Sequence, residues 1–394
     1  MHAATPVNAV AHHAPSAPLT TQEITRVADL AAHEGEWRRL VEELPEATLY
    51  NSWEWTSAKL ESYWPTAPVA ILLIRREGRL VGAAPLIVDR EADVWCRGAL
   101  TVPEERVDFP FTLPAAEVLD AALGHLGRTR RHWRLGLLRC PASSPLVPAL
   151  PEAARARGLH AFVRPAEPSR LVVPGGGWDA YLGSRSKHVR HEWRRKRRQL
   201  EKQGRVEIRK VTTRAQFDEV LPGVLAIEEA SWKHEAGLAI STQRRGRVFY
   251  PELARRGADR GWLRLHVLYL DSHPIAHFLG MRFRQRLYAL WTSYDHSQAR
   301  YSPGIAVVLA ALEDAFASGV TTVDLLGAEM RWKREVANDL REHVHACVYS
   351  GGAVGCRACS LARGTIRPAL AAGAPSLLRG LEQGLRRLKG RRGH

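Results

Sequence analysis

Apolar residues in the first half of the chain follow two different spacings. Between residues 35 and 44 they recur every three to four positions, which is typical of a helix with one buried face. Residues 69–88 instead form two apolar runs around Glu77 and Gly78, which is typical of a β-hairpin. The pattern predicts, in order, a short strand at 24–30, helices at 35–44 and 51–64, the hairpin at 69–88, a helix at 114–126 and a strand at 133–140.

The second half repeats this order. A Trp-bearing segment again follows the first helix and precedes a hairpin, which turns at 271–274. Internal duplication of this kind predicts an α/β protein (α+β, mixed sheet) built from two tandem units. The predicted elements are a strand at 206–213, a helix at 215–232 interrupted at Pro222, a hairpin at 263–283, a strand at 286–295, a helix at 303–318 and a strand at 321–327.

Stretches rich in Pro and Gly suggest where the units begin and end. We expect a disordered tail at 1–20, a first unit at 21–165 and a second unit at 170–350, with the boundary in the stretch near 165–175. Residues 361–394 form a basic amphipathic tail, with Leu377, Leu378, Leu381, Leu385 and Leu388 on one helical face. Such a helix binds a membrane surface or RNA, docks on the protein itself, or stays partly disordered.

Composition narrows the range of partners and compartments. The 394 residues carry a formal net charge of +16, which indicates an anionic partner or only an arginine-rich composition. Five cysteines, an odd number, argue against a disulfide framework and indicate a reducing compartment. The sequence shows no signal peptide and no apolar run of about 18 residues, so it predicts a cytoplasmic protein without a transmembrane segment.

Residues 291–319 predict a strand, a loop and a helix with a well-defined start. Ser302 is placed to cap the helix and Pro303 to begin it. Free N–H groups at a helix N-terminus favour an anion, Arg300 adds charge, and Gly304 lets a ligand approach the backbone. The loop is therefore a candidate phosphate site, or a well-capped helix start and no more. Its residues are Arg300, Tyr301, Ser302, Pro303, Gly304 and Ile305.

The order hairpin, strand, phosphate loop, helix, strand resembles the GNAT acyltransferase fold. The finer pattern resembles the CelD/BcsL-type branch, which is related to the Fem peptidyltransferases. The matching stretches are NSWEWT (51–56), RSKHVRHEWRRKRRQLEKQG (185–204), SWKHEAGL (231–238), LYLDSHPIAHFLG (268–280), WTSYD (291–295), YSPG (301–304) and VDLLGAEMRWKREV (323–336). The resemblance implies two GNAT units in tandem, with acetyl-CoA or another acyl-CoA as co-substrate rather than as a permanently bound cofactor.

The two units differ at the expected phosphate loop. The first unit has VDFPFTLPAAEV (107–118) in the corresponding place, without an SPG-type loop. By the resemblance, the second unit would hold the pyrophosphate of coenzyme A, and the first would shape the cleft for the acceptor.

Acyl transfer to an amine needs a base and a group that stabilises the tetrahedral oxyanion. Asp295 ends the strand before the loop, so it is a candidate base or amine-orienting group, or it only caps the loop. Tyr294 beside it is a candidate substrate contact or a core residue. The resemblance assigns oxyanion stabilisation to Lys333, which otherwise is a surface lysine.

A second group of candidates lies where the resemblance places the acceptor side. His234 is a candidate base and Trp232 a candidate substrate contact, while Glu228 and Glu229 are weaker candidates because helix carboxylates are usually solvated. The basic helix over 184–204 attracts phosphates or is a solvated face. Its candidate substrate-binding residues, at the entrance to the second unit, are Arg185, Lys187 and Arg190.

A metal site is not expected. His343, His345 and Cys347 share one face of a predicted strand, and Cys356 and Cys359 form a lone C-x-x-C. Their spacing fits no standard zinc site.

Three functions remain open from the sequence. The first is an N-acyltransferase that moves an acyl group from acyl-CoA to an amine on a sugar, a nucleotide-linked precursor or a secondary metabolite. The second is a Fem-like transferase that uses aminoacyl-tRNA as donor. The third is a non-enzymatic scaffold that binds RNA or an anionic polymer.

Overall fold

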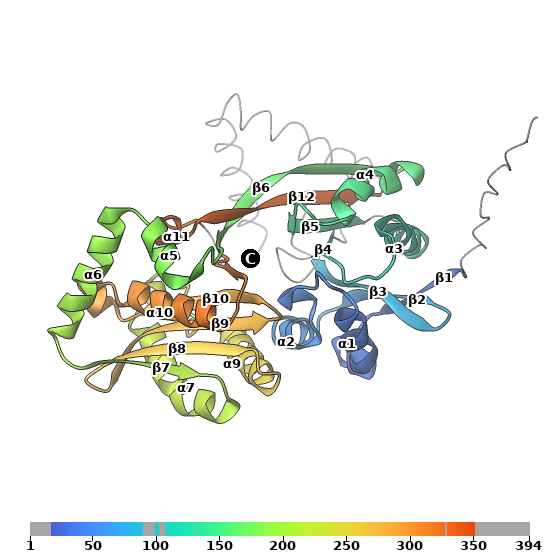
Figure 1. The fold of residues 1–394 in the computed structure, drawn as a ribbon. Coiled ribbons are helices and arrows are strands. Elements are labelled where there is room, and N and C mark those ends of the chain that lie inside the picture. Colours follow the sequence, from blue (N-terminus) through green and yellow to red (C-terminus); the bar gives the residue numbers. More distant parts are fainter. Residues whose placement is uncertain (1–16, 90–98, 102–107, 132, 328, 351–394) are drawn as a thin grey trace, which may run out of the picture.

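A computed structural model describes residues 17–89, 99–101, 108–131, 133–327 and 329–350. These residues build one mixed sheet in the order β1-β2-β3-β4-β5-β12-β6-β11-β10-β9-β8-β7 (Figure 1). The strands are β1 (Leu19–Ile24), β2 (Val69–Arg76), β3 (Arg79–Asp89), β4 (Ala99–Thr101), β5 (Arg134–Pro141), β6 (His160–Val172), β7 (Val206–Val211), β8 (Leu263–Leu270), β9 (His273–Phe283), β10 (Arg286–Tyr294), β11 (Thr322–Asp324) and β12 (Asp339–Tyr349).

The two ends of the sheet have the same topology. β1 to β4 and β7 to β10 are both antiparallel ladders. β4 then pairs in parallel with β5, and β10 pairs in parallel with β11. The predicted mixed α/β fold with a duplicated unit is therefore confirmed.

Two long strands join the units in the middle of the sheet. β12 pairs with both β5 and β6, and β6 also pairs with β11. The strand β6 includes the first part of the Pro- and Gly-rich stretch near 165–175 and ends at Val172. Each half of the chain thus supplies one central strand, and the sheet is continuous across both units.

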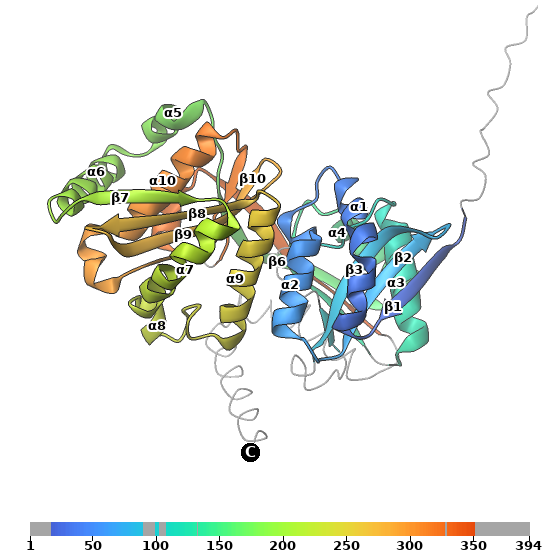
Figure 2. The same cartoon turned by 90° about the horizontal axis from the view of Figure 1, so that it is seen from below.

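Helices cover both faces of the sheet (Figure 2). In the second unit, α7, α8 and α9 lie on one face, while α10 lies on the other with α5 and α6. The helices are α1 (Glu34–Glu42), α2 (Trp53–Tyr63), α3 (Ala115–Thr129), α4 (Leu146–Ala156), α5 (Gly177–Ser184), α6 (Lys187–Glu201), α7 (Arg214–Glu229), α8 (Trp232–Glu235), α9 (Arg244–Asp259), α10 (Pro303–Ala317) and α11 (Arg331–Val336).

Two sequence predictions were wrong in detail. The strand predicted at 24–30 ends at Ile24 and is followed by a 3-10 helix, Val27–His33. Val27 and Leu30 are the buried residues of that helix, and their spacing of three suits a helical turn. The first strand also begins at Leu19, inside the segment expected to be disordered, of which residues 1–16 lie outside the described residues.

The expected interruption at Pro222 is also absent, because α7 continues through it from Arg214 to Glu229. Pro222 is exposed, so water can satisfy the carbonyl that the missing N–H leaves free.

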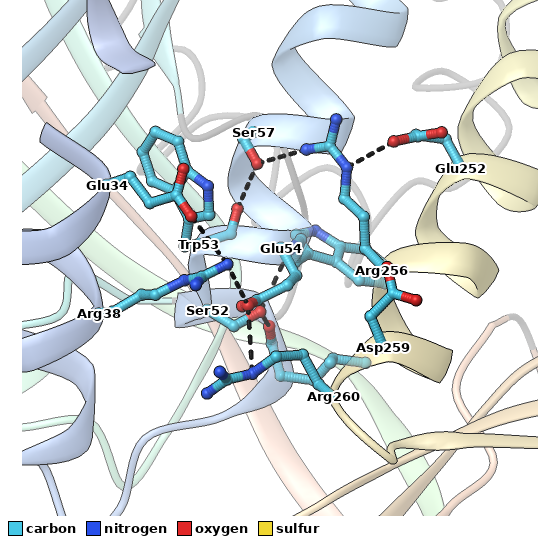
Figure 3. Close-up of polar contacts among 12 residues, drawn as sticks. Glu34, Arg38, Ser52, Trp53, Glu54, Ser57, Glu252, Arg256, Asp259 and Arg260 are labelled. Atoms are coloured by element: carbon cyan, nitrogen blue, oxygen red, sulfur yellow. Dashed lines mark hydrogen bonds and ion pairs between the residues drawn. The ribbon is translucent and has the colours of Figure 1, made fainter. Parts of the chain in front are cut away.

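The two units also meet through helices α2 and α9, which lie side by side (Figures 1 and 3). Arg256 of α9 donates to the hydroxyl of Ser57 and to the carboxylate of Glu61, both at 2.7 Å. Glu54 of α2 is only 3% exposed, and its Oε1 lies 2.9 Å from Arg38 and 3.4 Å from Arg260. An arginine of each unit therefore neutralises this buried carboxylate.

The structure describes only some of the residues on which the membrane and metal expectations rest. Across the described ranges, no helix is long and apolar enough to cross a membrane, and no group of three or more metal-ligating side chains is found. His343 and Cys347 are buried on β12. Cys356, Cys359 and the tail at 361–394 lie outside the described residues.

Candidate functional site

The strands β10 and β11 separate soon after they begin to pair. Residues 286–288 of β10 pair with 322–324, whereas β10 pairs with β9 as far as Tyr294. A register shift between Ala289 and Trp291 marks the point of divergence. Within the described chain, the last part of β10 therefore has a strand on one side only. Ligands in mixed α/β folds commonly bind where strands diverge at their C-terminal ends.

The helix α10 begins directly beside this free edge. Ser302 is its N-cap with φ of 54°, Pro303 is its first residue, and the Ser302 side chain makes no capping hydrogen bond. The carbonyl of Ser302 accepts from the N–H groups of Ile305 and Ala306, at 3.1 and 3.3 Å. The predicted cap position is confirmed, but the capping is done by the backbone rather than by the serine hydroxyl.

Two adjoining cavities, of about 190 and 390 Å³, lie between this helix start and α6. Both are lined by Ser302 and Ile305 from the loop and by Trp193 from α6. Tyr301 and the cationic Lys196 and Arg197 line the smaller one. The predicted phosphate loop thus borders a cavity whose other wall is the basic helix.

Two loop residues have contacts within the protein itself. The exposed guanidinium of Arg300 lies 4.5 Å from the ring centre of Tyr301, and the Arg300 carbonyl accepts from the amine of Lys196. A Cβ on Gly304 would lie 2.9 Å from the ring of Tyr294. The close approach at Gly304 is therefore made by Tyr294, which packs partly buried on the core beneath α10.

Asp295 and Lys333 have local partners. The Asp295 carboxylate accepts from the N–H of Ser297 at 2.9 Å and caps the 3-10 helix His296–Tyr301. Lys333 is only 5% exposed, and its amine donates to the carbonyl of Leu326. Its position stabilises the turn after β11, where Leu326 and Gly327 have positive φ.

The basic helix α6 lies across the start of α10, and the cationic side chains of this segment differ in their contacts. Arg185, just before it, donates to the carbonyl of Ala337, whereas Lys187 is exposed. Arg190 lines a third cavity of about 350 Å³ together with Trp178 and Trp193. Of the three predicted substrate contacts here, Arg190 lies on a cavity and Arg185 holds the end of α11.

The segment that carries Trp232 and His234 forms the short helix α8. His234 is exposed, with Nδ1 3.4 Å from the hydroxyl of Ser241, and Trp232 is half-buried. Lys233 between them reaches the sheet, since its amine donates to the carbonyl of Thr292 on β10 and lies 4.4 Å from the ring centre of Trp291. Burial lowers the pKa of Lys233, and the charge of Glu228 acts in the opposite direction.

A buried polar cluster lies on the same face of β10. Glu228 of α7 is fully buried, and its Oε1 accepts from Nε2 of His277 at 2.8 Å and from the indole N–H of Trp291 at 2.9 Å. Its Oε2 accepts from the N–H of Ile240 at 3.0 Å. Burial alone would raise the pKa of Glu228, but its hydrogen bonds with His277 and Ile240 and the charges around it lower it to about 2. Glu228 is therefore ionised inside the core.

Residues 187–334 match the sequence profile of the acetyltransferase (GNAT) domain. The second unit is therefore similar to a GNAT acetyltransferase domain in sequence. The profile begins with α6, contains the cluster around Glu228 and the free edge of β10, and ends in α11. Comparison with curated protein sequences finds no match.

Solved structures resemble the chain over both units. The structure of FemX gives a TM-score of 0.58 at 12% identity and covers 87% of this chain and 99% of its own. A conserved protein of unknown function from Bacteroides thetaiotaomicron gives 0.52 at 11% identity, over 84% and 100%. The C-terminal domain of a putative lysylphosphatidylglycerol synthetase from Agrobacterium fabrum gives 0.50 at 12% identity, over 84% and 94%. At these identities the likeness concerns the fold.

The GNAT domain brings only some of the predicted site residues together. Tyr301, Ser302 and Ile305 line cavities beside α6, and Tyr294 packs against Gly304 at the same helix start. The helix α8, which carries Trp232 and His234, instead lies on the face of the sheet covered by α7 and α9 (Figure 2). The predicted residues thus lie on both faces of β10, with that strand between them.

The buried cluster around Glu228 was not predicted from the sequence. Glu228 was expected to be solvated, yet it falls four residues after Val224 on the stripe that also holds Phe217 and Val220. A carboxylate on the apolar stripe of a helix is a sign of a buried partner. His277 within the apolar strand β9 is the matching sign.

Proposed function

We propose that this protein is an N-acyltransferase of the CelD/BcsL type that moves an acyl group from acyl-CoA to an amine. The observation that carries the proposal is the match of residues 187–334 to a GNAT acetyltransferase domain. In this part of the chain a cavity at the start of α10 is lined by Lys196 and Arg197 and also by Glu192, Glu313 and Glu335. The free edge of β10 follows Tyr288 and ends at Tyr294, which packs against Gly304 at the start of α10. An acyl thioester along this edge would have its phosphates beside Ser302, Lys196 and Arg197.

Acyl transfer requires the protein mainly to orient the two substrates and to transfer a proton. The amine attacks the thioester carbonyl, the tetrahedral oxyanion needs hydrogen-bond donors, and the thiolate leaves. Arg300 and the cations of α6 are suited to the phosphates of the donor. Asp295 accepts a hydrogen bond from its own loop, and Lys333 donates one to the carbonyl of Leu326. This geometry favours a positioning role for each of the two residues.

The proposal is tested by calorimetric titration of the purified protein with acetyl-CoA. Arg300→Glu should weaken binding by roughly one to two orders of magnitude, since a charge-assisted contact is replaced by repulsion. Arg39→Glu is the matched control, because Arg39 is an exposed arginine on α1 of the first unit. If the wild type binds acetyl-CoA and both variants bind it equally well, Arg300 is not part of the site.

A second donor is favoured by the basic helix over the loop and by the fold shared with FemX across most of the chain. In that alternative the donor is aminoacyl-tRNA, and phosphates of the acceptor end lie along α6. No binding of acetyl-CoA at millimolar concentration, combined with salt-sensitive binding of aminoacyl-tRNA, would support it. The acceptor amine would be the same in kind.

A further inference from the structure

Three side chains form a row from the centre of α7 to the free edge of β10. Glu228 lies on α7, His277 on β9 and Ser293 on β10. Ser293 and His277 are directly opposite each other in the β9–β10 ladder. Their Cβ atoms therefore project from the same face, at the roughly 5 Å typical of cross-strand pairs.

The carboxylate determines which nitrogen of His277 carries a proton. The ionised Glu228 can only accept hydrogen bonds, and it accepts from Nε2 of His277 at 2.8 Å. Nε2 must therefore carry the hydrogen, and in the neutral ring Nδ1 is left as an acceptor. A carboxylate that fixes the tautomer of a histidine is a recurring way to prepare its other nitrogen as a base.

The hydroxyl and the prepared nitrogen both keep hydrogen-bonding capacity. Within the described part of the chain, neither Nδ1 of His277 nor Oγ of Ser293 has a hydrogen-bond partner, although His277 is fully buried and Ser293 is 3% exposed. Buried polar atoms are nearly always paired in folded proteins. The two atoms face each other without being hydrogen-bonded, so proton transfer between them requires Oγ of Ser293 to turn towards Nδ1 of His277 when the acceptor binds.

Ser293 lies on the free edge of β10. It belongs to the part of β10 beyond the last pair with β11, and the next residue, Tyr294, packs against Gly304 at the start of α10. The carbonyl before it, of Thr292, is held by Lys233. The row of three residues thus begins in the core and ends on the strand that leads into the donor loop.

We propose that Ser293, His277 and Glu228 form a proton relay for the acceptor amine. As the amine nitrogen bonds to the acyl carbon, its proton passes to Oγ of Ser293, and the serine proton passes to Nδ1 of His277. The carboxylate of Glu228 stabilises the resulting imidazolium. When the carbon–sulfur bond breaks, the proton returns through Ser293 to the departing thiolate, so one proton moves from amine to thiol and the protein is unchanged.

This inference rests on the proposed acyl transfer, and it assigns different roles to the three residues. Ser293 is the catalytic residue because it alone would touch the amine, and His277 acts through it. Glu228 is a positioning residue. Among the described residues, the charged groups that face His277 are Glu228 from α7 and Lys233 from α8.

The first test needs no acceptor, because nitrogen NMR of the histidine rings reports the tautomer directly. We expect His277 in the wild-type protein to show the Nε2–H tautomer, with its signal assigned by its loss in His277→Asn. Ser293→Ala should shift the Nδ1 signal. An Nδ1–H tautomer, or an Nδ1 signal that Ser293→Ala leaves in place, would overturn the relay.

The second test is kinetic and separates the relay from the proposed function. Calorimetry with acetyl-CoA first establishes whether the donor binds at all; no binding contradicts the acyl-CoA function, while the NMR outcome still decides the relay. With a set of primary amines and acetyl-CoA, Ser293→Ala should slow release of the coenzyme A thiol on the order of 10²-fold, with unchanged acetyl-CoA affinity.

The matched control is Ser57→Ala, which removes another buried serine hydroxyl, from α2 of the first unit. It should lower the free energy of unfolding without slowing thiol release. Equal rates for Ser293→Ala and the wild type, with the same pH profile, would rule the relay out. His277→Gln, which is close to histidine in size, repeats the measurement if Ser293→Ala fails to fold.

Discussion

Two buried glutamates, one from each unit, are stabilised in different ways. Glu54 on α2 is neutralised by Arg38 from its own unit and by Arg260 from α9 (Figure 3). Glu228 on α7 accepts from His277, the indole of Trp291 and the N–H of Ile240. Arginine keeps its charge at any ordinary pH, whereas histidine gains or loses a proton near neutrality. The first arrangement therefore ties two units together, and the second can take part in proton transfer.

The difference also concerns access to water. The side chains of Arg38 and Arg260 are 35% and 39% exposed, so they can be solvated again if Glu54 is removed. His277 is fully buried, so water cannot replace its hydrogen bond to Glu228. We therefore expect removal of the Glu228 carboxylate to destabilise the protein more than removal of the Glu54 carboxylate, because its donors stay buried and unpaired.

The largest expected effect is that of Glu228→Leu. The change leaves the donors on His277, Trp291 and Ile240 without their acceptor in the core, which should cost about 3–5 kcal/mol of the free energy of unfolding. Urea denaturation measures it, with Glu54→Leu as the matched control. A cost for Glu228→Leu no greater than that for Glu54→Leu would remove the distinction between the two sites.

The second prediction concerns pH. In the folded protein the pKa of Glu228, about 2, lies below its ordinary value of 4.5, so folding favours the ionised form. Its stabilisation is complete above pH 4.5 and is lost as the pH falls towards 2, by roughly 3 kcal/mol in all. Urea denaturation at pH 6 and pH 3 should show about 2 kcal/mol of this loss in the wild type, and a smaller loss in Glu228→Gln. An identical pH dependence in both proteins would mean that Glu228 is not the group responsible.

The third prediction is the smaller effect of Glu54→Gln. The amide keeps the size of the side chain but loses the charge between Arg38 and Arg260, both of which stay in contact with water. We expect a loss of about 1–2 kcal/mol, mainly from weaker contact between the two units. Thermal unfolding measures the loss, and Glu61→Gln on the exposed side of α2 is the control. An increase in stability would show that burying the charge of Glu54 costs more free energy than its contacts with Arg38 and Arg260 contribute.

Local signals in the sequence were sufficient for much of the fold. The start of α10 is set by Ser302 and Pro303, and both hairpins were placed because their turns carry residues that tolerate positive φ, such as Gly78 and Asp271. These features depend on neighbours within a few positions of the chain. The 3-10 helix at Val27–His33 was missed because its seven residues are too few to show a clear period.

The site depends on contacts that sequence spacing does not encode. His277 lies 49 residues from Glu228, and only the pairing of β9 with β10 brings Ser293 to the same place. Lys333 was expected at the surface or in the cleft, whereas the turn after β11 buries it against Leu326. The glutamate on the apolar stripe of α7 was visible in the sequence, but its partner was not.

The smallest expected effect lies at the edge of the interface between the units. Arg256 donates to the carboxylate of Glu61 at 2.7 Å, but that carboxylate is 50% exposed, so water competes for both groups. A double-mutant cycle with Arg256→Gln and Glu61→Gln should give a coupling of about 0.5 kcal/mol, reduced further by salt. The corresponding cycle for Arg38 and Glu54 should give a larger value, because Glu54 is buried. If the exposed pair coupled as strongly as the buried one, burial would not be what distinguishes the contacts of α2, and the contrast between Glu54 and Glu228 would rest on histidine alone.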